Sequence, residues 1–337
     1  MGNNMRFRND TGTISAIPYA ILVLVIFGLF LVGMGPVIDE IILVDNQMMG
    51  QATVTTSPPT VAPTPTPAPG PELVLVAAGE SHSLALWSNG TGIAWGGNWD
   101  DQCDIPASLQ ATALTPGWYH TLALTADGTV VAWGLNTSRQ CDVPANLQAT
   151  ALAAGAFHSL ALTADGEVVA WGGNGDGQCD VPAGLVATEI AAGAGHSLAL
   201  TTDGVVVAWG DNWNGQCDVP AGLIAEEIAA GWYHSLALTA DGTVVAWGMN
   251  TSSQCDAPAG LVAKEIAAGK YHTLALTTDG EVAAWGAGSA TTVPAGLVAK
   301  EIAAGGFHSL ALTTDGAVVA WGDNWDSQCD VPEELVG

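Results

Sequence analysis

The sequence predicts an all-β seven-bladed propeller preceded by one long hydrophobic N-terminal α-helix and a Pro/Thr-rich linker. Three observations support this prediction. The seven histidines of the 337-residue chain recur every 38 residues, with a final step of 36. An uncharged stretch from Thr11 to Ile38 comes before these repeats, and a proline-rich and threonine-rich segment separates the two parts. A fixed period of about 40 residues is typical of propellers.

The chain begins with a short basic leader, residues 1–12, which contains Arg6 and Arg8. Residues 13–50 are predicted to form a transmembrane or filament-core helix, because the 25 residues from Ile14 to Ile38 can cross a hydrocarbon core of about 30 Å. A secretory signal peptide is the alternative, but its apolar part is normally only about 7–15 residues long. Arginines before the helix and acids after it predict that the repeats lie outside the cell.

This region also resembles the start of archaeal type IV pilins. The resemblance is carried by Arg8-Asn-Asp-Thr-Gly12 followed by Thr13-Ile-Ser-Ala-Ile-Pro18. Because pilins are cut after a glycine just before the apolar helix, it implies cleavage between Gly12 and Thr13 and self-assembly through the helix. Ile17 stands where many bacterial pilins carry a glutamate. A single-pass membrane anchor that keeps its leader is the alternative.

Residues 51–71 are predicted to be an extended linker. Residues 53–72 contain seven prolines and six threonines. Proline lacks the backbone donor that regular structure needs, so we expect a polyproline-like spacer of up to about 60 Å. The threonines are candidate O-glycosylation sites.

Residues 72–337 are predicted to form the propeller. In a representative unit, Glu227–Ala230, His234–Leu238 and Val244–Trp247 are apolar runs too short for an ordinary helix. Asp241-Gly242 joins the last two runs and suits a tight hairpin. Apolar residues on both alternating faces indicate a sheet covered on both sides. Four-stranded blades arranged around an axis would accommodate the short strands and cover both faces of each sheet. The strands of one blade could come from different copies of the repeat.

These units resemble the regulator of chromosome condensation repeat, in the compact bacterial and archaeal form that ends Q-C-D-V-P-A-G-L. The motifs are G-x-x-H-S-L-A-L, D-G-x-V-x-A-W-G and G-x-N-x-x-G-Q. The eukaryotic founder of the family is a nuclear exchange factor for a small GTPase and binds chromatin. Neither role fits the short loops or the 29 acidic and four basic residues of residues 72–337. Because nucleic acid requires a basic surface, we expect no nucleic-acid partner.

The repeated histidines are predicted to be structural, each tying its strand to a neighbouring loop. They are His82, His120, His158, His196, His234, His272 and His308. An active site normally breaks the symmetry of its scaffold, and the sequence contains no such catalytic constellation. We therefore expect a chain without enzymatic activity and without a cofactor.

Six cysteines occupy the Q-C-D slot of six repeats and are predicted to be free, buried thiols. They are Cys103, Cys141, Cys179, Cys217, Cys255 and Cys329. Neighbouring blades separate such positions beyond the roughly 7 Å limit between α-carbons for a disulfide. Cysteine and histidine also stand about 20 residues apart in each unit, without a C-x-x-C pair, so we expect no metal site.

The departures from the repeat are candidate binding residues. The loop aromatics Trp99, Trp213, Trp325, Trp118 and Trp232 stand in positions that could bind glycans, with Asn or Asp beside the first three. Packing between the blades is the alternative role for these rings. The sequons at Asn89, Asn136 and Asn250 are candidate N-glycosylation sites.

The predicted function is that of a cell-surface structural or display protein: a pilin-like filament subunit or a membrane-anchored propeller. Its partners would be the membrane, copies of itself through the N-terminal helix, and glycans or other surface components. The formal net charge of −27 suits a soluble outer surface. The alternative is a membrane-anchored extracellular propeller enzyme or lectin that acts on polysaccharide.

Overall fold

The computed structural model describes residues 70–337. The leader, the helix over residues 13–50, the Gly12–Thr13 site and all but the last two residues of the predicted linker lie outside the described residues. Gly70 and Pro71, which end that linker, precede the first strand without regular structure. Within residues 70–337, the structure contains no helix long and apolar enough to cross a bilayer.

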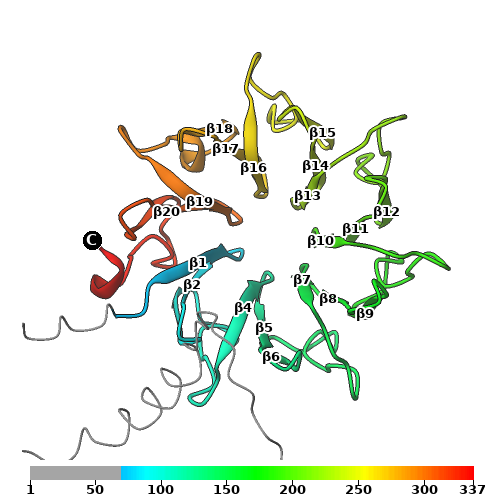
Figure 1. The fold of residues 1–337 in the computed structure, drawn as a ribbon, viewed down its shortest axis with the longest axis horizontal. Coiled ribbons are helices and arrows are strands. Elements are labelled where there is room, and N and C mark those ends of the chain that lie inside the picture. The colour runs from blue at the N-terminus through cyan, green and yellow to red at the C-terminus, as the bar shows by residue number, and fades with distance from the viewer. Residues whose placement is uncertain (1–69) are drawn as a thin grey trace, which may run out of the picture. The chain divides into compact units, whose positions relative to one another are not determined.

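Seven antiparallel sheets, arranged as blades around a central axis, form the described part of the chain (Figure 1). Each blade contains three strands in sequence order. Blades 1 to 3 comprise β1 (Leu73–Ala78), β2 (His82–Trp87) and β3 (Gly92–Gly96); β4 (Ala111–Pro116), β5 (His120–Thr125) and β6 (Val130–Gly134); and β7 (Ala151–Ala154), β8 (His158–Leu162) and β9 (Val168–Gly172). Blades 4 and 5 comprise β10 (Glu189–Ala192), β11 (His196–Leu200) and β12 (Val206–Gly210); and β13 (Glu227–Ala230), β14 (His234–Leu238) and β15 (Val244–Gly248). Blades 6 and 7 comprise β16 (Ala263–Ala268), β17 (His272–Thr277) and β18 (Val282–Gly286); and β19 (Ala299–Ala304), β20 (His308–Thr313) and β21 (Val318–Gly322).

The blades have three strands, so the expectation of four was wrong. The segment after each third strand forms turns instead of a fourth ladder. In blade 1, the Gln102 carbonyl accepts hydrogen bonds from Thr121 Oγ1 (2.9 Å) and Trp133 Nε1 (3.0 Å) of blade 2. Pro106 follows and has no N–H to donate. This segment therefore packs on the next blade through side chains.

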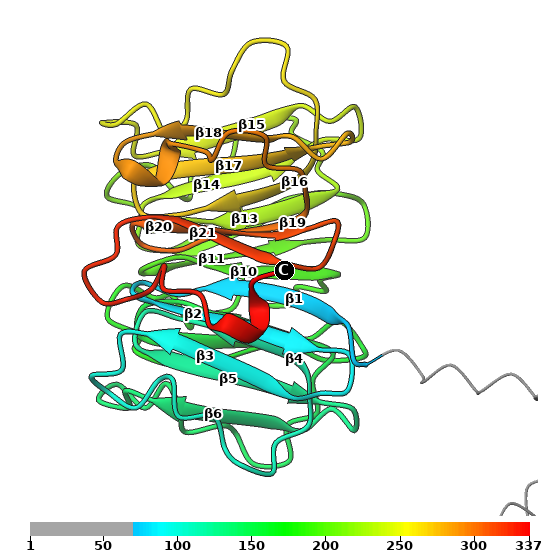
Figure 2. The same ribbon diagram turned by 90° about the vertical axis from the view of Figure 1, so that its left-hand side faces the viewer.

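The ring closes between blade 7 and blade 1, and each blade is built from a single repeat. Gln328 of the last repeat accepts hydrogen bonds from Ser83 Oγ (2.9 Å) and Trp95 Nε1 (3.0 Å) of the first. The short 3-10 helix η2 (Glu333–Leu335) follows, and its Leu335 packs with Leu73 of β1 (Figure 2). The closing seam thus repeats the contacts between all other neighbouring blades.

The hydrophobic core lies between blades. Leu198 of β11, Ala237 of β14 and Trp247 of β15 belong to one buried cluster that joins blades 4 and 5. Leu236 and Ala237 are neighbours on one strand, yet neither is exposed to solvent. Both faces of the middle strand are therefore covered, as the apolar alternation predicts.

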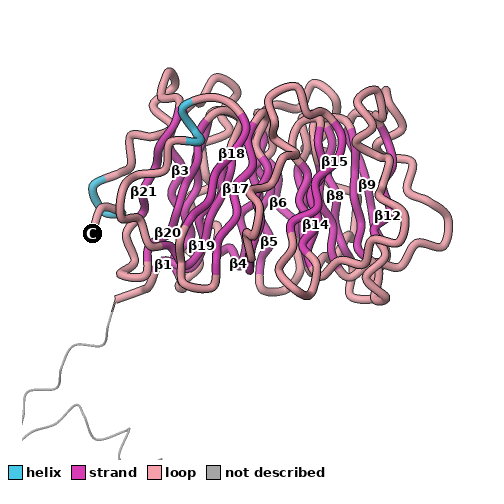
Figure 3. Tube along the Cα trace, turned by 90° about the horizontal axis from the view of Figure 1, so that it is seen from above, coloured by secondary structure: helices cyan, strands magenta, loops and turns pink. Residues whose placement is uncertain are grey.

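The ring has two different faces (Figure 3). One face carries the Asp-Gly and Asn-Gly hairpins between the second and third strands, and Gly70 and Pro71 enter β1 from it; we call it the linker face. The opposite face carries the loops between the first and second strands and those after the third; we call it the mouth face. The N-terminal attachment and the mouth face therefore lie on opposite sides of the ring.

Candidate functional site

The histidines form a continuous ring of contacts between blades. Each Nε2 lies 2.9–3.2 Å from the hydroxyl oxygen of the residue after the histidine in the next blade, and His308 with Ser83 closes the circle. That hydroxyl donates to a backbone carbonyl, which belongs to Ala290 for Ser309 and to a glutamine in the other six links, as for Ser235 with Gln216 (2.8 Å). The imidazole must therefore donate through Nε2. The partner is thus a strand hydroxyl and not the loop that the sequence suggests.

Burial keeps these imidazoles neutral. All seven histidines are at most 1% exposed. Desolvation, together with a smaller effect of the neighbouring imidazoles of His158 and His234, lowers the pKa of His196 to about 3. A group that stays neutral, buried and hydrogen-bonded holds the scaffold together. It is not placed to exchange protons with a ligand.

The six cysteines are free, but they are partly exposed and not buried as expected. Each Sγ lies 3.3 Å from a backbone carbonyl of its own loop, such as Cys217 with Asp211, and donates to it. Desolvation raises the pKa of the Cys217 thiol to about 11, with help from Asp211 and Asp218. In residues 70–337 no group of three or more His, Cys, Asp or Glu side chains is arranged to hold a metal ion.

Trp99, Trp213 and Trp325 lie at the tips of rigid loops on the mouth face. Their side chains are 82%, 90% and 90% exposed, so they do not fill gaps between blades. In blade 7, Asn324 donates to Asp330 (2.7 Å) and accepts from the Cys329 N–H (2.7 Å). Equivalent bonds hold the other two loops. These asparagines make their hydrogen bonds within the loop. The indole and the nearby carboxylates are therefore the groups that can contact a ligand.

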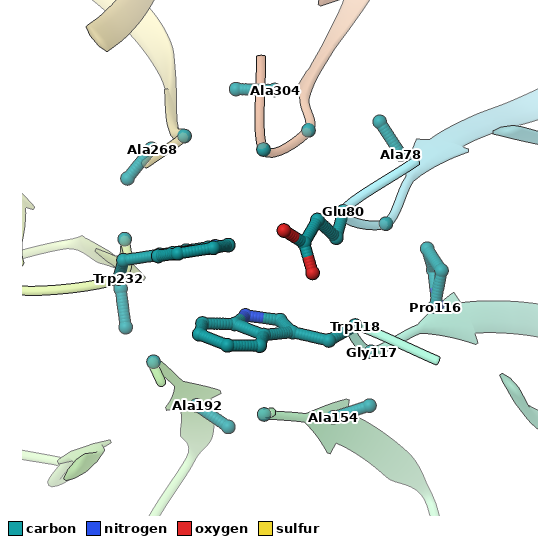
Figure 4. A pocket seen from close by; sticks show the side chains of 18 residues that line it. Ala78, Glu80, Pro116, Gly117, Trp118, Ala154, Ala192, Trp232, Ala268 and Ala304 are labelled. Carbon is teal, nitrogen blue, oxygen red and sulfur yellow. The ribbon is translucent and has the colours of Figure 1, made fainter. Parts of the chain in front are cut away.

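Trp118 and Trp232 reach over the central axis and stack on each other (Figure 4). Their ring centroids are 3.6 Å apart and the ring planes are inclined by 26°. Lys270 Nζ lies 3.3 Å from the centroid of the Trp232 ring, so that ring is covered on both sides. The pair therefore forms a cap, and the prediction that these two rings bind glycans stays a prediction.

A cavity of about 120 Å³ lies at the axis, at this cap. Small residues at the ends of the inner strands line it, chiefly Ala78, Ala154, Ala192, Ala230, Ala268 and Ala304. A glycine follows each of these alanines, and a side chain there would not fit. A Cβ on Gly193, for example, would clash with the His196 ring and the Gly231 carbonyl. The blades converge at the axis, so small residues occupy these positions, with Pro116 in the place of alanine in blade 2.

Glu80 also lines the axial cavity, and its carboxyl group points toward the two indoles (Figure 4). Its Oε2 is buried without a hydrogen-bond partner in the described part of the chain. Desolvation raises the pKa of Glu80, whereas Tyr119 and Lys270 act to lower it. A buried carboxylate oxygen without a donor is a group that a ligand can satisfy.

A second concave site lies at the seam between blades 7 and 1. This seam groove has a volume of about 400 Å³ and is lined by Glu80, Ser81, Trp99, Tyr119, Phe307, Asp323, Trp325, Asp326 and Gln328. Of these residues, only the two tryptophans were predicted from the sequence. Four of the others belong to the varied dipeptide before each histidine, which reads Glu-Ser in blade 1, Trp-Tyr in blade 2 and Gly-Phe in blade 7. Asp323, Asp326 and Gln328 belong to the loop of Trp325.

The three sequon asparagines are all exposed. Asn89 lies in a hairpin of the linker face, where its Oδ1 accepts from the Thr91 N–H (3.0 Å). Asn136 and Asn250 lie on the mouth face and hold their loops through Asp142 and Asp256 (2.8 Å each). Candidate glycans would thus be carried on both faces.

Together, the fold and the site define a seven-bladed propeller. Its inner strands end in small residues at the axis, and the loops of its mouth face carry aromatic side chains. The profile of the regulator of chromosome condensation (RCC1) repeat matches residues 113–140, 149–178, 187–216, 226–254, 263–290 and 299–328. These six segments cover more than half of the chain, and the protein belongs to this family. The first blade lies outside the matched segments. No match was found among curated protein sequences.

Solved structures show the same fold. The ectodomain of the receptor kinase CR4 from Physcomitrella patens is 24% identical, with a TM-score of 0.65 over 75% of this chain and 74% of that one. The ectodomain of the receptor kinase ACR4 from Arabidopsis thaliana is 22% identical, with a TM-score of 0.64 over 76% and 98%. Prp20p from Saccharomyces cerevisiae, studied for binding to Gsp1p and histones, is 21% identical, with a TM-score of 0.63 over 77% and 84%.

Proposed function

We propose that the protein is a cell-surface display protein. Its N-terminal helix would anchor the chain in a membrane or in a pilin-like filament, and its propeller would present the mouth face for adhesion to glycans or other surface components. One observation carries this proposal. Gly70 and Pro71 enter the ring on the linker face, whereas the exposed indoles of Trp99, Trp213 and Trp325 belong to loops of the mouth face. A propeller held by one face presents the other to its surroundings.

The exposed indoles supply what a sugar surface needs. A flat aromatic face stacks on the apolar side of a pyranose ring, and carboxylates bond its hydroxyl groups. The loops that carry these indoles are already held by their asparagine and glutamine side chains, so little ordering entropy is lost on binding. The propeller thus serves as a rigid support for loop-borne contacts.

Display and adhesion can be tested in the native cells. Proteinase K added to intact cells should remove the propeller, and intact mass with N-terminal sequencing should find Thr13 as the first residue of the mature chain. A chain that begins at Met1 contradicts pilin-type processing and leaves the single-pass anchor. A propeller that is protected in intact cells but digested after lysis contradicts surface display altogether.

Adhesion should depend on the mouth face. Replacing Trp99, Trp213 and Trp325 together by alanine should reduce attachment of cells to glycan-coated surfaces. Val205→Ala is the matched control, because Val205 is a 45% exposed apolar residue in a hairpin of the linker face. Equal loss of attachment in both variants would argue against a role for the mouth face.

A polysaccharide-acting enzyme is the second candidate, and the seam groove favours it. Glu80, whose pKa is raised by burial, shares this groove with Asp326. A pair of carboxyl groups in one groove is the usual equipment for hydrolysis of a glycosidic bond. Release of shorter products from oligosaccharides by the full-length chain, lost in Glu80→Gln, would establish this activity in place of binding alone.

A further inference from the structure

We propose that the seam groove binds a protonated amino sugar, that is, a pyranose ring that carries an ammonium group. This inference rests on the proposed adhesive function and names the ligand class for one part of the mouth face. The seam is the one place in the described ring where the loops after the third strand carry a tryptophan on two adjacent blades. Trp325 belongs to blade 7 and Trp99 to blade 1, and both line one groove.

The charge of the groove selects a cation. Three of its lining side chains, Glu80, Asp323 and Asp326, are acidic, and no lysine or arginine lines it. Desolvation is the main cause that raises the pKa of Glu80, and repulsion from the nearby Asp326 carboxylate adds to it. A bound ammonium group would relieve this repulsion and donate hydrogen bonds to the carboxylates that line the groove.

The aromatic rings of the mouth already hold a cation. Lys270 Nζ lies 3.3 Å from the ring centroid of Trp232 and 4.6 Å from that of Phe307. Phe307 also lines the seam groove. Attraction between an ammonium group and the face of an aromatic ring is therefore in use at this mouth, beside a site that has similar rings and no basic group of its own.

The size and exposure of the tryptophans favour a sugar over a lysine side chain. The ammonium of Lys270 is held by rings of which Trp232 is only 9% exposed, whereas Trp99 and Trp325 are 82% and 90% exposed. Two open indoles offer far more flat surface than a single ammonium group covers. A pyranose ring can stack on such a surface while its amino group meets the carboxylates.

The test compares two ligands that differ in charge. The full-length chain, purified in a non-ionic detergent, is titrated calorimetrically with the glucosamine trimer, which is cationic, and with its N-acetylated form, which is neutral. We expect the cationic trimer to bind at least about tenfold more tightly at low ionic strength, and the difference to shrink in 0.5 M salt. Equal binding of both trimers overturns this inference and leaves glycan adhesion standing.

Matched variants locate the site. Trp325→Ala and Asp326→Asn should each weaken binding of the cationic trimer by about tenfold, and Asp326→Asn should also reduce the preference for it. Trp213→Ala is the control, since Trp213 occupies the same loop position in blade 4 with 90% exposure, but neither neighbouring blade carries a tryptophan at that position. Equal losses in all three variants overturn the assignment to the seam. Unchanged near-ultraviolet circular dichroism shows that each variant is folded.

Two further outcomes would change the ligand class. Binding of the peptide Gly-Lys-Gly as tightly as the trimer, with competition between them, would replace the amino sugar by a lysine side chain. Cleavage of the trimer, seen by mass spectrometry, would replace binding by hydrolysis. The assay does not depend on where the protein resides in the cell, so its failure is distinguishable from failure of surface display.

Discussion

Breaking one link of the histidine ring is expected to destabilise the propeller markedly. Ser235 Oγ accepts from His196 Nε2 (3.0 Å) and donates to the Gln216 carbonyl (2.8 Å), and both His196 and Ser235 are fully buried. Ser235→Ala leaves the imidazole N–H without an acceptor. The Gln216 carbonyl keeps its bond from Trp247 Nε1 (2.9 Å).

The expected loss follows from these contacts. A buried donor left without a partner costs about 1–3 kcal/mol, and the lost bond to the carbonyl adds about 0.5–1.5 kcal/mol. Ser235→Ala should therefore lower the free energy of unfolding by about 2–4 kcal/mol. Ser235→Thr is the control, because Thr121 and Thr273 occupy the same position in blades 2 and 6 and make the same bonds. Its effect should stay below about 1 kcal/mol.

Urea unfolding of the full-length chain, followed by tryptophan fluorescence, measures both variants. The midpoint should fall for Ser235→Ala at unchanged m-value and should scarcely move for Ser235→Thr. A change within about 0.5 kcal/mol for the alanine variant would refute the assigned role of the ring, as would equal losses for alanine and threonine.

Four more predictions follow from the same structure. Ser83→Ala at the seam should lower the free energy of unfolding as much as Ser235→Ala does in the same urea assay, because Ser83 makes the same pair of hydrogen bonds with His308 and Gln328 (2.9 Å each). Stability measured against pH should rise from about pH 3 to 6.5 and level off near pH 7. The seven histidines, with pKa values of about 3 to 4 against 6.5 when unfolded, lose stability as the pH falls from 6.5. Glu189, Glu227 and Glu301, whose pKa is raised to about 7 from 4.5 by burial, lose stability as the pH rises from 4.5 to 7, which makes the rise less steep in that range. Gly193→Ala should lower the free energy of unfolding by at least about 3 kcal/mol or prevent accumulation of folded protein. Gly175→Ala should leave the melting temperature unchanged, because nothing lies within 4 Å of the added Cβ. At pH 8 the six thiols, with pKa values of about 11, should react with a thiol reagent at least about 100-fold more slowly than free cysteine, and all six should react rapidly once the chain is unfolded.

The chemistry of the repeat made most of the fold predictable. The 38-residue spacing of histidine and tryptophan, the Asp-Gly hairpins and the two-sided apolar strands led to seven radial blades, and the structure confirms them. The count of strands per blade was wrong because it followed the four-stranded blades typical of propellers, whereas each repeat contains only three apolar runs. The Gln102 carbonyl after the third strand bonds to side chains of the next blade, and no spacing within one repeat reveals that.

The candidate site was only partly predictable. The sequence places Trp99 and Trp325 some 226 residues apart and on equivalent loops, and ring closure is what makes them neighbours. It also shows Trp118 and Trp232 as the same repeat position, whereas the structure stacks them on each other across the axis. Lys270 and Glu80 fall in the variable dipeptide before each histidine, and their meeting with these rings depends on the convergence of seven loops.

Local periodicity and turn chemistry were therefore sufficient for the blades, because each blade is completed within about 38 residues and depends on contacts near in sequence. The seam groove, the aromatic cap and the histidine ring join residues from different blades. Such contacts are set by how the ring closes, since closure alone brings the first repeat beside the last and points unlike loops at one axis. The tertiary structure thus decided which departures from the repeat act together.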